Sequence, residues 1–573
     1  MSDRSRSRAR GVCLAAFIAL AGSPVALGQW TSDASLNTGV CTAAGDQVQP
    51  KLKRAPDGSF RLAWFDNRSG GYDVYIQKLS SAGVPEWTAD GVLIADRNQS
   101  STNDFDLEVD ASGNAFVAFS DDRQGLPLVA TVAKVSPAGA ILWQRTLASA
   151  GTANDPRLLV MGDGSVICAY IASLSGPTNS AIELYRLNAS TGANVWPGVG
   201  RVTQSEPSPV RPYNTGDLAR ADGDNFWLTI RRATGTSFSS GRHVYCQKFD
   251  GGGAAQLPNT TTPTPLLLWN TDGLPIAFYP PAIADGNGGL FTAWYSGPSA
   301  NFKNRVQRVS SAGVVQFATP PQGSTSGSQA NCSADFIPTT GDMFLCWPEK
   351  NSNQSLTGVG AQRFDVDGNP QWSSAGVVIL PLGATDKSFV QGLSSAGGSY
   401  TVMWFDFSDA VNQTVRATRI NADGSNAWSP NPIITLSSNV TSKGRMVSER
   451  DGNSVVLAWH ESRGGNTNIY VQRLNADGSL GVDPVLRCSA ADIAYDNGDP
   501  LPPLGVPGGV NNGVTEADYN VFFANFFDSL PICDIANDDG SPLPPFGPLT
   551  TNNGVTEGDY NLFFSIFFDG CAF

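Results

Sequence analysis

The C-terminal segment 488–573 contains the residues whose types and spacing indicate chemistry most clearly. It carries twelve Asp and Glu side chains and neither Lys nor Arg. A folded segment with this charge needs cations from outside the chain, and oxygen ligands at this density favour the hard ion Ca²⁺. The segment is therefore predicted to be a separate, acidic, metal-binding module.

This segment is also an internal duplication. Residues 492–498 return as 534–540, and residues 511–520 return as 552–561. Each acidic stretch precedes aromatic residues at positions i, i+3, i+4, i+7 and i+8, which form one apolar stripe on a helix. The residues are Tyr519, Phe522, Phe523, Phe526 and Phe527, then Tyr560, Phe563, Phe564, Phe567 and Phe568. Two short helices that face each other with these stripes would form the core of a small module.

Paired Asp-rich loops, each followed by a short helix, resemble a dockerin, in particular the dockerin-like modules of exported bacterial proteins that end in a Gly-Cys tail such as Gly570-Cys571. The resemblance covers residues 488–573. It implies Ca²⁺-dependent folding with up to two sites, and attachment to a cohesin-type partner or to the cell surface. The ligands it implies are Asp492, Asp496 and Asp518 in the first site and Asp534, Asp538 and Asp559 in the second, with Asp539 as an alternative to Asp538.

The acidic module departs from the dockerin pattern in its spacing. The first and last predicted ligands of the first site lie 26 residues apart, farther than in a dockerin loop. A second interpretation of Asp518 and Asp559 is helix capping. Thr515 and Thr556 are good N-cap residues that place each acid at the third helical position, beside the positive end of the helix dipole. Both interpretations can hold together.

The longer N-terminal part of the chain is built on a repeat. An anchor residue marks each of eight copies at spacings of 51 to 64 residues: Trp64, Phe119, Tyr170, Ile230, Trp294, Trp347, Trp404 and Trp459. In the first copy, alternation of period two predicts strands before Asp57, through Trp64, from Val74 to Leu79, and near Val92. Four strands per copy predict an all-β, eight-bladed β-propeller, with a seven-bladed ring as the alternative.

The copies resemble the repeats of bacterial secreted β-propellers over residues 29–487, and this resemblance implies an architecture but no ligand. The segment Gln29–Thr31 matches Glu86–Thr88 of the first copy. The N-terminus is therefore expected to supply a strand that closes the ring beside the last copy. The repeated tryptophans are expected to pack between blades and not to bind carbohydrate.

Acidic residues with a nearby Arg follow the second strand in several copies. The pairs are Asp66 with Arg68, Asp122 with Arg123, and Glu461 with Arg463. Because the pattern repeats, a salt bridge in a turn explains every copy at once, whereas a catalytic set should depart from the repeat. The two histidines, His243 and His460, lie on different copies and are expected to be ordinary side chains. The sequence thus favours a protein without catalytic residues.

Residues 1–28 have the basic start, short apolar core and small final residues of a secretory signal peptide. They predict a secreted or cell-surface protein with no transmembrane segment in the mature chain. A net charge of −14, from 37 basic and 51 acidic residues, disfavours nucleic acid. The eight cysteines that remain after cleavage are compatible with disulfides. Cys332 and Cys346 form the nearest pair, and Cys168 and Cys246 are expected to be buried thiols.

These patterns predict three segments: a signal peptide (1–28), a β-propeller (29–487), and a small, mainly helical, dockerin-like module (488–573). The favoured function is a secreted, non-enzymatic propeller that displays a binding surface for a protein or glycan ligand and is attached through the module. The alternative is a polysaccharide-degrading enzyme, a glycoside hydrolase or lyase, with its site at the mouth of the propeller channel. An enzyme would bring together carboxylates from non-equivalent repeat positions.

Overall fold

The structure is a computed structural model. It describes residues 30–102, 105–174, 179–197, 201–204, 212–237, 240–257, 264–275, 278–409, 411–428, 430–481, 489–501, 514–543, 551–552 and 554–568. The predicted signal peptide, Cys488 and Cys571 lie outside these residues.

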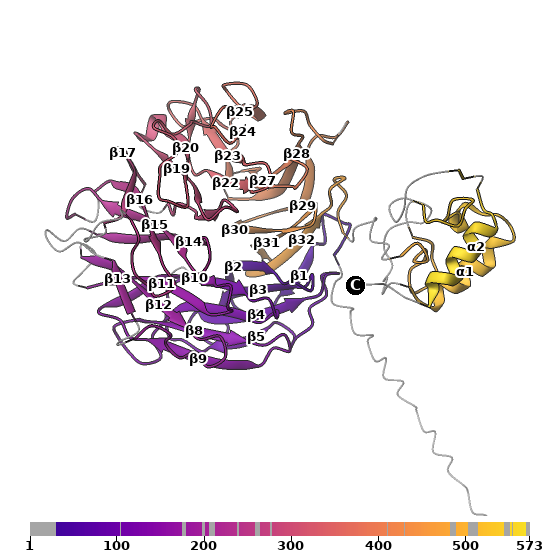
Figure 1. Ribbon diagram of the computed structural model, residues 1–573, viewed down its shortest axis with the longest axis horizontal. Helices are drawn as coiled ribbons and strands as arrows, with labels where there is room; N and C mark the ends of the chain where they lie inside the picture. The colour runs from indigo at the N-terminus through magenta and orange to yellow at the C-terminus, as the bar shows by residue number, and fades with distance from the viewer. Residues whose placement is uncertain are drawn as a thin grey trace, which may run out of the picture.

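The chain from Thr38 to Leu474 forms eight antiparallel sheets arranged as the blades of a propeller (Figure 1). Blade 1 comprises β2 (Gln47–Arg54), β3 (Phe60–Asp66), β4 (Asp73–Leu79) and β5 (Val92–Ala95). Blade 2 comprises β6 (Asp106–Val109), β7 (Ala115–Asp121), β8 (Val129–Val135) and β9 (Ile141–Leu147). Blade 3 comprises β10 (Thr152–Val160), β11 (Val166–Ser173), β12 (Ser180–Leu187) and β13 (Arg201–Gln204). Blade 4 comprises β14 (Tyr213–Arg220), β15 (Phe226–Ala233), β16 (Arg242–Phe249) and β17 (Leu266–Leu274).

Blade 5 comprises β18 (Ile283–Ala284), β19 (Leu290–Ser296) and β20 (Lys303–Val309). Blade 6 comprises β21 (Ser328–Gln329), β22 (Ser333–Ile337), β23 (Asp342–Lys350), β24 (Thr357–Phe364) and β25 (Val377–Gly383). Blade 7 comprises β26 (Lys387–Ser394), β27 (Tyr400–Phe407), β28 (Gln413–Ile420) and β29 (Ile434–Thr441). Blade 8 comprises β30 (Lys443–Asp451), β31 (Ser454–Arg463) and β32 (Asn466–Leu474), together with the N-terminal strand β1 (Thr38–Cys41). The prediction of eight blades is confirmed.

The ring closes as the N-terminal sequence predicts. β1 pairs antiparallel with β32, so the last sheet has the order β1-β32-β31-β30. Figure 1 shows indigo β1 beside the orange strands of blade 8. Trp30, which precedes β1, packs edge-on against Phe60 and donates its indole N–H to the Ser81 carbonyl at 2.6 Å. The closure pairs two sheet edges that would otherwise be open to other chains.

Blade 5 differs from the predicted four-stranded unit. Its described sheet has only three strands, β18-β19-β20. The chain beyond β20 makes isolated hydrogen bonds to it, such as that from the Val306 N–H to the Pro321 carbonyl at 3.1 Å. Pro320 and Pro321 have no N–H to donate, so this segment does not form a continuous fourth strand.

The cores of the propeller lie between neighbouring blades. All eight anchor side chains are fully buried, among them Trp64, Trp347 and Trp459. Trp64, for example, packs with residues of blades 1 and 8. A fully buried indole cannot serve as a carbohydrate platform, so the packing interpretation of the repeated tryptophans is confirmed.

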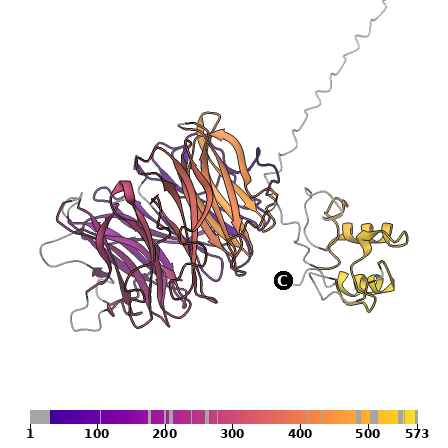
Figure 2. The same ribbon diagram turned by 90° about the horizontal axis from the view of Figure 1, so that it is seen from above.

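The acidic segment contains two helices, α1 (Glu516–Phe526) and α2 (Glu557–Phe567), with a short 3₁₀ turn between them at Pro531–Cys533. A second 3₁₀ turn lies in the propeller at Ser299–Asn301. α1 and α2 lie side by side in both views (Figure 1 and Figure 2). Phe522 stacks on Phe563 with ring centroids 3.9 Å apart, so the predicted aromatic stripes face each other. Their last members, Phe527 and Phe568, were expected in this core but are exposed, because both helices end one residue before them.

The described cysteines are Cys41, Cys168, Cys246, Cys332, Cys346 and Cys533, and all are free. The predicted disulfide between Cys332 and Cys346 is therefore not formed, although Cys346 lies opposite Ser333 across β22 and β23. Cys168 and Cys246 are fully buried, as predicted. No helix in the described part of the chain is long and apolar enough to cross a membrane.

Candidate binding site at the channel mouth

The innermost strands of several blades carry a β-bulge at the same place. The register shifts between Val48 and Lys51 in β2, and the equivalent shift occurs in β10, β26 and β30. The extra residue adopts the left-handed backbone conformation, which non-glycine residues rarely do. Five such residues, which we call the bulge ring, each lie six positions before the turn that ends the inner strand: Gln49, Asp155, Asn331, Phe389 and Arg445, with φ between 48° and 59°.

The surroundings of Gln49 explain how the chain holds this conformation, which costs on the order of 1 kcal/mol or more. Its backbone N–H donates to Nδ1 of His460 at 3.1 Å, and its side-chain amide donates to Oγ1 of Thr102 at 2.7 Å. Burial, aided by the charge of Arg445, lowers the pKa of His460 to about 4. His460 is therefore a neutral acceptor at neutral pH. A Cβ on Gly444 would lie 2.5 Å from its Nε2, so this position needs glycine.

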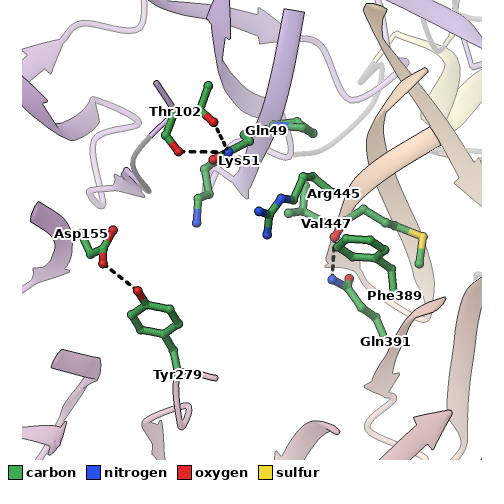
Figure 3. Close-up of a pocket in the computed structure, with 11 residues that line it drawn as sticks. Gln49, Lys51, Thr102, Asp155, Tyr279, Phe389, Gln391, Arg445 and Val447 are labelled. Atoms are coloured by element: carbon green, nitrogen blue, oxygen red, sulfur yellow. Dashed lines mark hydrogen bonds between the residues drawn. The ribbon is translucent and has the colours of Figure 1, made fainter. Parts of the chain in front are cut away.

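A cavity of about 460 Å³ opens where these inner strands begin. This volume is in the range of small-molecule sites. Figure 3 shows its walls, which come from β2, β10, β26, β30 and the segments before β6 and β18. The lining residues are Gln49, Pro50, Lys51, Thr102, Asp155, Tyr279, Phe389, Gln391, Arg445, Met446 and Val447. Four of the five bulge-ring residues thus line a single cavity.

One wall of the cavity is an aspartate–tyrosine pair. The Tyr279 hydroxyl donates to Oδ2 of Asp155 at 2.6 Å. The guanidinium of Arg231 lies 3.9 Å from the centroid of the Tyr279 ring, and that of Arg157 lies 4.9 Å from it. Burial and the charge of Asp155 raise the pKa of Tyr279 to about 12. The phenol is therefore a protonated hydrogen-bond donor at neutral pH and not a nucleophile.

Two cationic side chains occupy the opposite wall. Lys51 of β2 and Arg445 of β30 both extend toward the open interior of the cavity (Figure 3). The side chain of Gln391 donates to the Met446 carbonyl at 2.6 Å, which joins the bulges of β26 and β30. Phe389 lies beside this bond. The cavity thus combines positive charge, an aromatic face and several amide and hydroxyl groups.

A second group of charged residues lies deeper on the channel wall. Nζ of Lys53 is 2.8 Å from Glu108 and 4.0 Å from Glu449. Burial raises the pKa of Glu108 well above its usual value, although the charge of Lys53 opposes this. The three residues occupy the same inner-strand position in blades 1, 2 and 8. They therefore link adjacent blades across the point of ring closure.

The acid–Arg pairs at the blade ends belong to the framework. Arg68 pairs with Asp66 at 2.9 Å, and Arg463 with Glu461 at 2.8 Å. In blade 2 the partner of Arg123 is Asp121 at 2.8 Å and not Asp122, which corrects the prediction. Asp121 is the last residue of β7 and points into the blade, so it holds the place that Asp66 holds in blade 1.

The carboxylates of these pairs are buried and anchor the neighbouring strands. Asp66 and Glu461 also accept the indole N–H of Trp64 and Trp459, at 3.1 Å and 2.8 Å. Glu461 additionally lies 2.9 Å from Lys443, and both side chains are fully buried. These pairs recur with the repeat and lie outside the cavity lining, as expected for structural salt bridges.

Two of the predicted calcium ligands serve as hydrogen-bond acceptors that hold the helical module together. Oδ1 of Asp518 accepts the backbone N–H groups of Ile493 and Ala494, each at 2.7 Å. Its Oδ2 accepts the N–H of Thr515 at 2.7 Å and lies 3.2 Å from the Thr515 hydroxyl. Asp559 makes the same four contacts in the second half of the module, with Ile535, Ala536 and Thr556.

These four donors use all the lone pairs of each carboxylate, so Asp518 and Asp559 do not fit a cation. The capping interpretation of both residues is confirmed, because a capping box is present at the start of α1 and α2. We call Asp518 and Asp559 the clasp residues.

The other predicted ligands are dispersed. Asp492 is buried, and Asp496, Asp538 and Asp539 are exposed. Asp534 accepts the side-chain amide of Asn552 at 3.0 Å. Within the described ranges, no three His, Cys, Asp or Glu side chains gather as a metal site. Calcium binding by these five residues stays a prediction.

The residues of the cavity were not identified from the sequence. Copies were recognised by what repeats, whereas the bulge ring carries a different residue in each blade. A signal exists in the aligned copies: six positions before the turn, the chain reads Gln-Pro, Asp-Pro, Phe-Val and Arg-Met in blades 1, 3, 7 and 8. Variation at one place within an otherwise regular repeat would have marked these positions.

No protein-family model and no curated protein matches the sequence. Solved propeller structures are similar in fold. The Dos1 propeller is 13% identical with a TM-score of 0.42, over 75% of this chain and 93% of that chain. Polysaccharide lyase Uly1 is 8% identical with a TM-score of 0.39, over 76% and 91%. The GH93 α-L-arabinofuranosidase of Fusarium graminearum is 11% identical with a TM-score of 0.35, over 58% and 98%. At these identities the similarity concerns the fold alone.

Proposed function

We propose that this protein is a non-enzymatic binding propeller whose ligand occupies the cavity at the channel mouth. The observation that carries the proposal is the bulge ring. One backbone device repeats around the axis, but the side chains it presents to the cavity are an amide, a carboxylate, an aromatic ring and a guanidinium. Strained backbone that is kept while its side chains diverge is typical of a functional site.

The chemistry of the cavity supports binding over hydrolysis. A glycosidase of the common type needs two carboxyl groups on either side of the scissile bond. Among the described lining residues only Asp155 is a carboxylate, and it accepts the Tyr279 hydroxyl. The second candidate function, a polysaccharide-degrading enzyme, is favoured by that same Asp155–Tyr279 pair, which a substrate hydroxyl could join.

We also propose that the protein is exported and that its acidic module attaches it to a cohesin-type partner or to the cell surface. The predicted signal peptide and the duplicated helical module support this role. Phe527 and Phe568 occupy equivalent positions just beyond α1 and α2 and are 76% and 80% exposed. Large exposed aromatic side chains at equivalent positions are expected at a contact surface. Ca²⁺ would be held by the acids outside the clasp, and calorimetric titration of the full chain with Ca²⁺ tests this.

The proposed ligand site is tested by screening the full chain against a panel of oligosaccharides and peptides. For each ligand that binds, amide hydrogen exchange is then compared with and without the ligand. We expect protection in β2, β26 and β30, which form the cavity walls. Protection limited to outer strands such as β5 and β9 would contradict the proposal. Release of a shortened oligosaccharide during the incubation would favour the enzymatic alternative.

A further inference from the structure

Arg445 differs in its partners from the arginines that hold the blades together. Those arginines lie within hydrogen-bond distance of a carboxylate, as Arg123 does with Asp121 and Arg363 with Asp342. Arg445 is exposed in the wall of the cavity, and no carboxylate of the described residues lies within 4.0 Å of it. A guanidinium with no carboxylate partner, placed in a concave site, is suited to bind an oxyanion of a ligand.

The backbone fixes the direction of this side chain. Arg445 is the left-handed residue of the β30 bulge, with φ of 52°. The bulge is joined to β26 by the hydrogen bond from Gln391 to the Met446 carbonyl. Figure 3 shows the guanidinium extended toward the same open space as the amine of Lys51. The charge of Arg445 also helps to lower the pKa of His460, so its field is felt inside the site.

The sign of this charge opposes that of the whole chain. The net charge of −14 repels anions at long range. Lys51 and Arg445 are the two cationic side chains among the residues that line the cavity. A guanidinium placed in a cavity can bind one anionic group of a ligand at a defined position.

The neighbours of Arg445 indicate what else the ligand carries. Phe389 holds the same ring position on the preceding blade and presents an aromatic face. Gln391 lies beside it, and Thr102 and Tyr279 carry hydroxyl groups on other walls of the cavity. A pyranose ring has an apolar face and a rim of hydroxyls, so it matches a cavity that combines an aromatic surface with polar walls. An extended acidic peptide offers the charge without that rim.

We infer that Arg445 binds the oxyanion of an acidic saccharide, a carboxylate or a sulfate, whose ring packs on Phe389. This inference rests on the proposed function and adds the class of ligand. It predicts binding that weakens as salt is raised, because the recognised group is charged.

Calorimetry with the full chain tests the inference. The ligands are hexagalacturonate for the carboxylate, a sulfated carrageenan hexasaccharide for the sulfate, neutral cellohexaose, and a hexaglutamate peptide. Arg445→Gln keeps the backbone, because Gln49 adopts the same conformation in blade 1. Arg145→Gln is the matched control, since Arg145 is an exposed arginine of β9, the outer strand of blade 2, and does not line the cavity. We expect at least one acidic saccharide to bind and Arg445→Gln to weaken it about tenfold or more, with no change in Arg145→Gln.

The outcomes separate the inference from the proposed function. Cellohexaose binding as tightly as the acidic saccharides, with no effect of Arg445→Gln, would overturn the anionic class and leave the cavity as a ligand site. Binding of hexaglutamate alone, dependent on Arg445, would overturn the saccharide class. If no ligand protects β2, β26 or β30 from exchange, the proposed function fails together with the inference.

Discussion

The blade ends and the channel mouth of this propeller use repeated positions in opposite ways. At the blade ends the same chemistry returns from copy to copy: a buried carboxylate, a nearby Arg and, in blades 1 and 8, an indole N–H. At the channel mouth the same backbone conformation returns with different side chains, from Gln49 to Phe389 to Arg445. The difference indicates that residues which repeat hold the fold, whereas residues that vary on a repeated backbone make the site.

The acidic module extends this comparison to a part of the chain without Lys or Arg. In the acidic module, the buried carboxylates of the clasp residues accept backbone N–H groups. In the propeller, the buried carboxylates pair with guanidinium groups instead. Both halves of the module keep the same contacts, so the clasps belong with the repeated, structural residues. A buried carboxylate needs donors, but these need not be cations.

The largest effect should follow removal of a blade-end carboxylate. Glu461→Ala leaves the fully buried Lys443 and its neighbour Arg463 without their partner. Loss of one member of a buried ion pair costs about 3 to 5 kcal/mol. Chemical denaturation of the full chain should detect this loss. The matched control, Glu86→Ala, breaks the surface pair with Lys78 and should cost within about 1 kcal/mol. Equal losses in both variants would contradict the structural role.

A smaller and more local effect is expected in the acidic module. Asp518→Ala removes the acceptor of the Ile493, Ala494 and Thr515 N–H groups. Leaving a buried donor unsatisfied costs about 1 to 3 kcal/mol. Hydrogen exchange in α1 should therefore accelerate while exchange in the blades is unchanged. Asp539→Ala, which removes an exposed acid bonded only to Ser541 in the described structure, should leave α1 unaffected.

These predictions follow the line between what the sequence revealed and what it did not. Features that recur along the chain were visible in the sequence. They are the eight anchors, the N-terminal strand that closes the ring, the two aromatic helices and the caps at Thr515 and Thr556. Each leaves a local pattern of period two or 3.6, or a fixed spacing, that the fold then satisfies.

Features that depend on three-dimensional neighbours were not visible. The register that makes Asp121 the partner of Arg123 depends on which face of β7 each acid occupies. The bulge ring gathers residues from strands almost 400 positions apart, such as Gln49 and Arg445. His460 was expected to be ordinary, but it accepts the Gln49 N–H because two blades meet at the closure. None of these contacts leaves a periodic pattern.

A weaker effect on stability should depend on pH through His460, which lies in the sheet of blade 8 and contacts the bulge-ring residue Gln49. The pKa of His460 is lowered to about 4 in the fold, compared with an ordinary value near 6.5. Above pH 6.5 the folded and unfolded chains both hold it neutral. Between about pH 6.5 and pH 4 the unfolded chain takes up a proton that the fold excludes, so stability decreases as the pH falls through this window. Denaturation at pH 7 and pH 5 should reveal a smaller decrease in His460→Gln, and equal decreases in both proteins would contradict it.

The smallest change in stability is expected at the bulge ring itself. Gly adopts the left-handed conformation without strain but loses more conformational entropy on folding. Because Arg445 is exposed, Arg445→Gly should therefore change the free energy of unfolding by no more than about 1 kcal/mol.

The central claim is that this ring binds the ligand and does not hold the fold. The measurement that tests it most directly compares affinity and melting temperature in the full chain for Arg445→Gly and Glu461→Ala, using the tightest ligand from the oligosaccharide and peptide panel. The account predicts that Arg445→Gly loses affinity at least tenfold and melts within a few degrees of the parent chain, whereas Glu461→Ala melts much earlier. An Arg445→Gly variant that binds as tightly as the parent chain, or that unfolds as readily as Glu461→Ala, would contradict it.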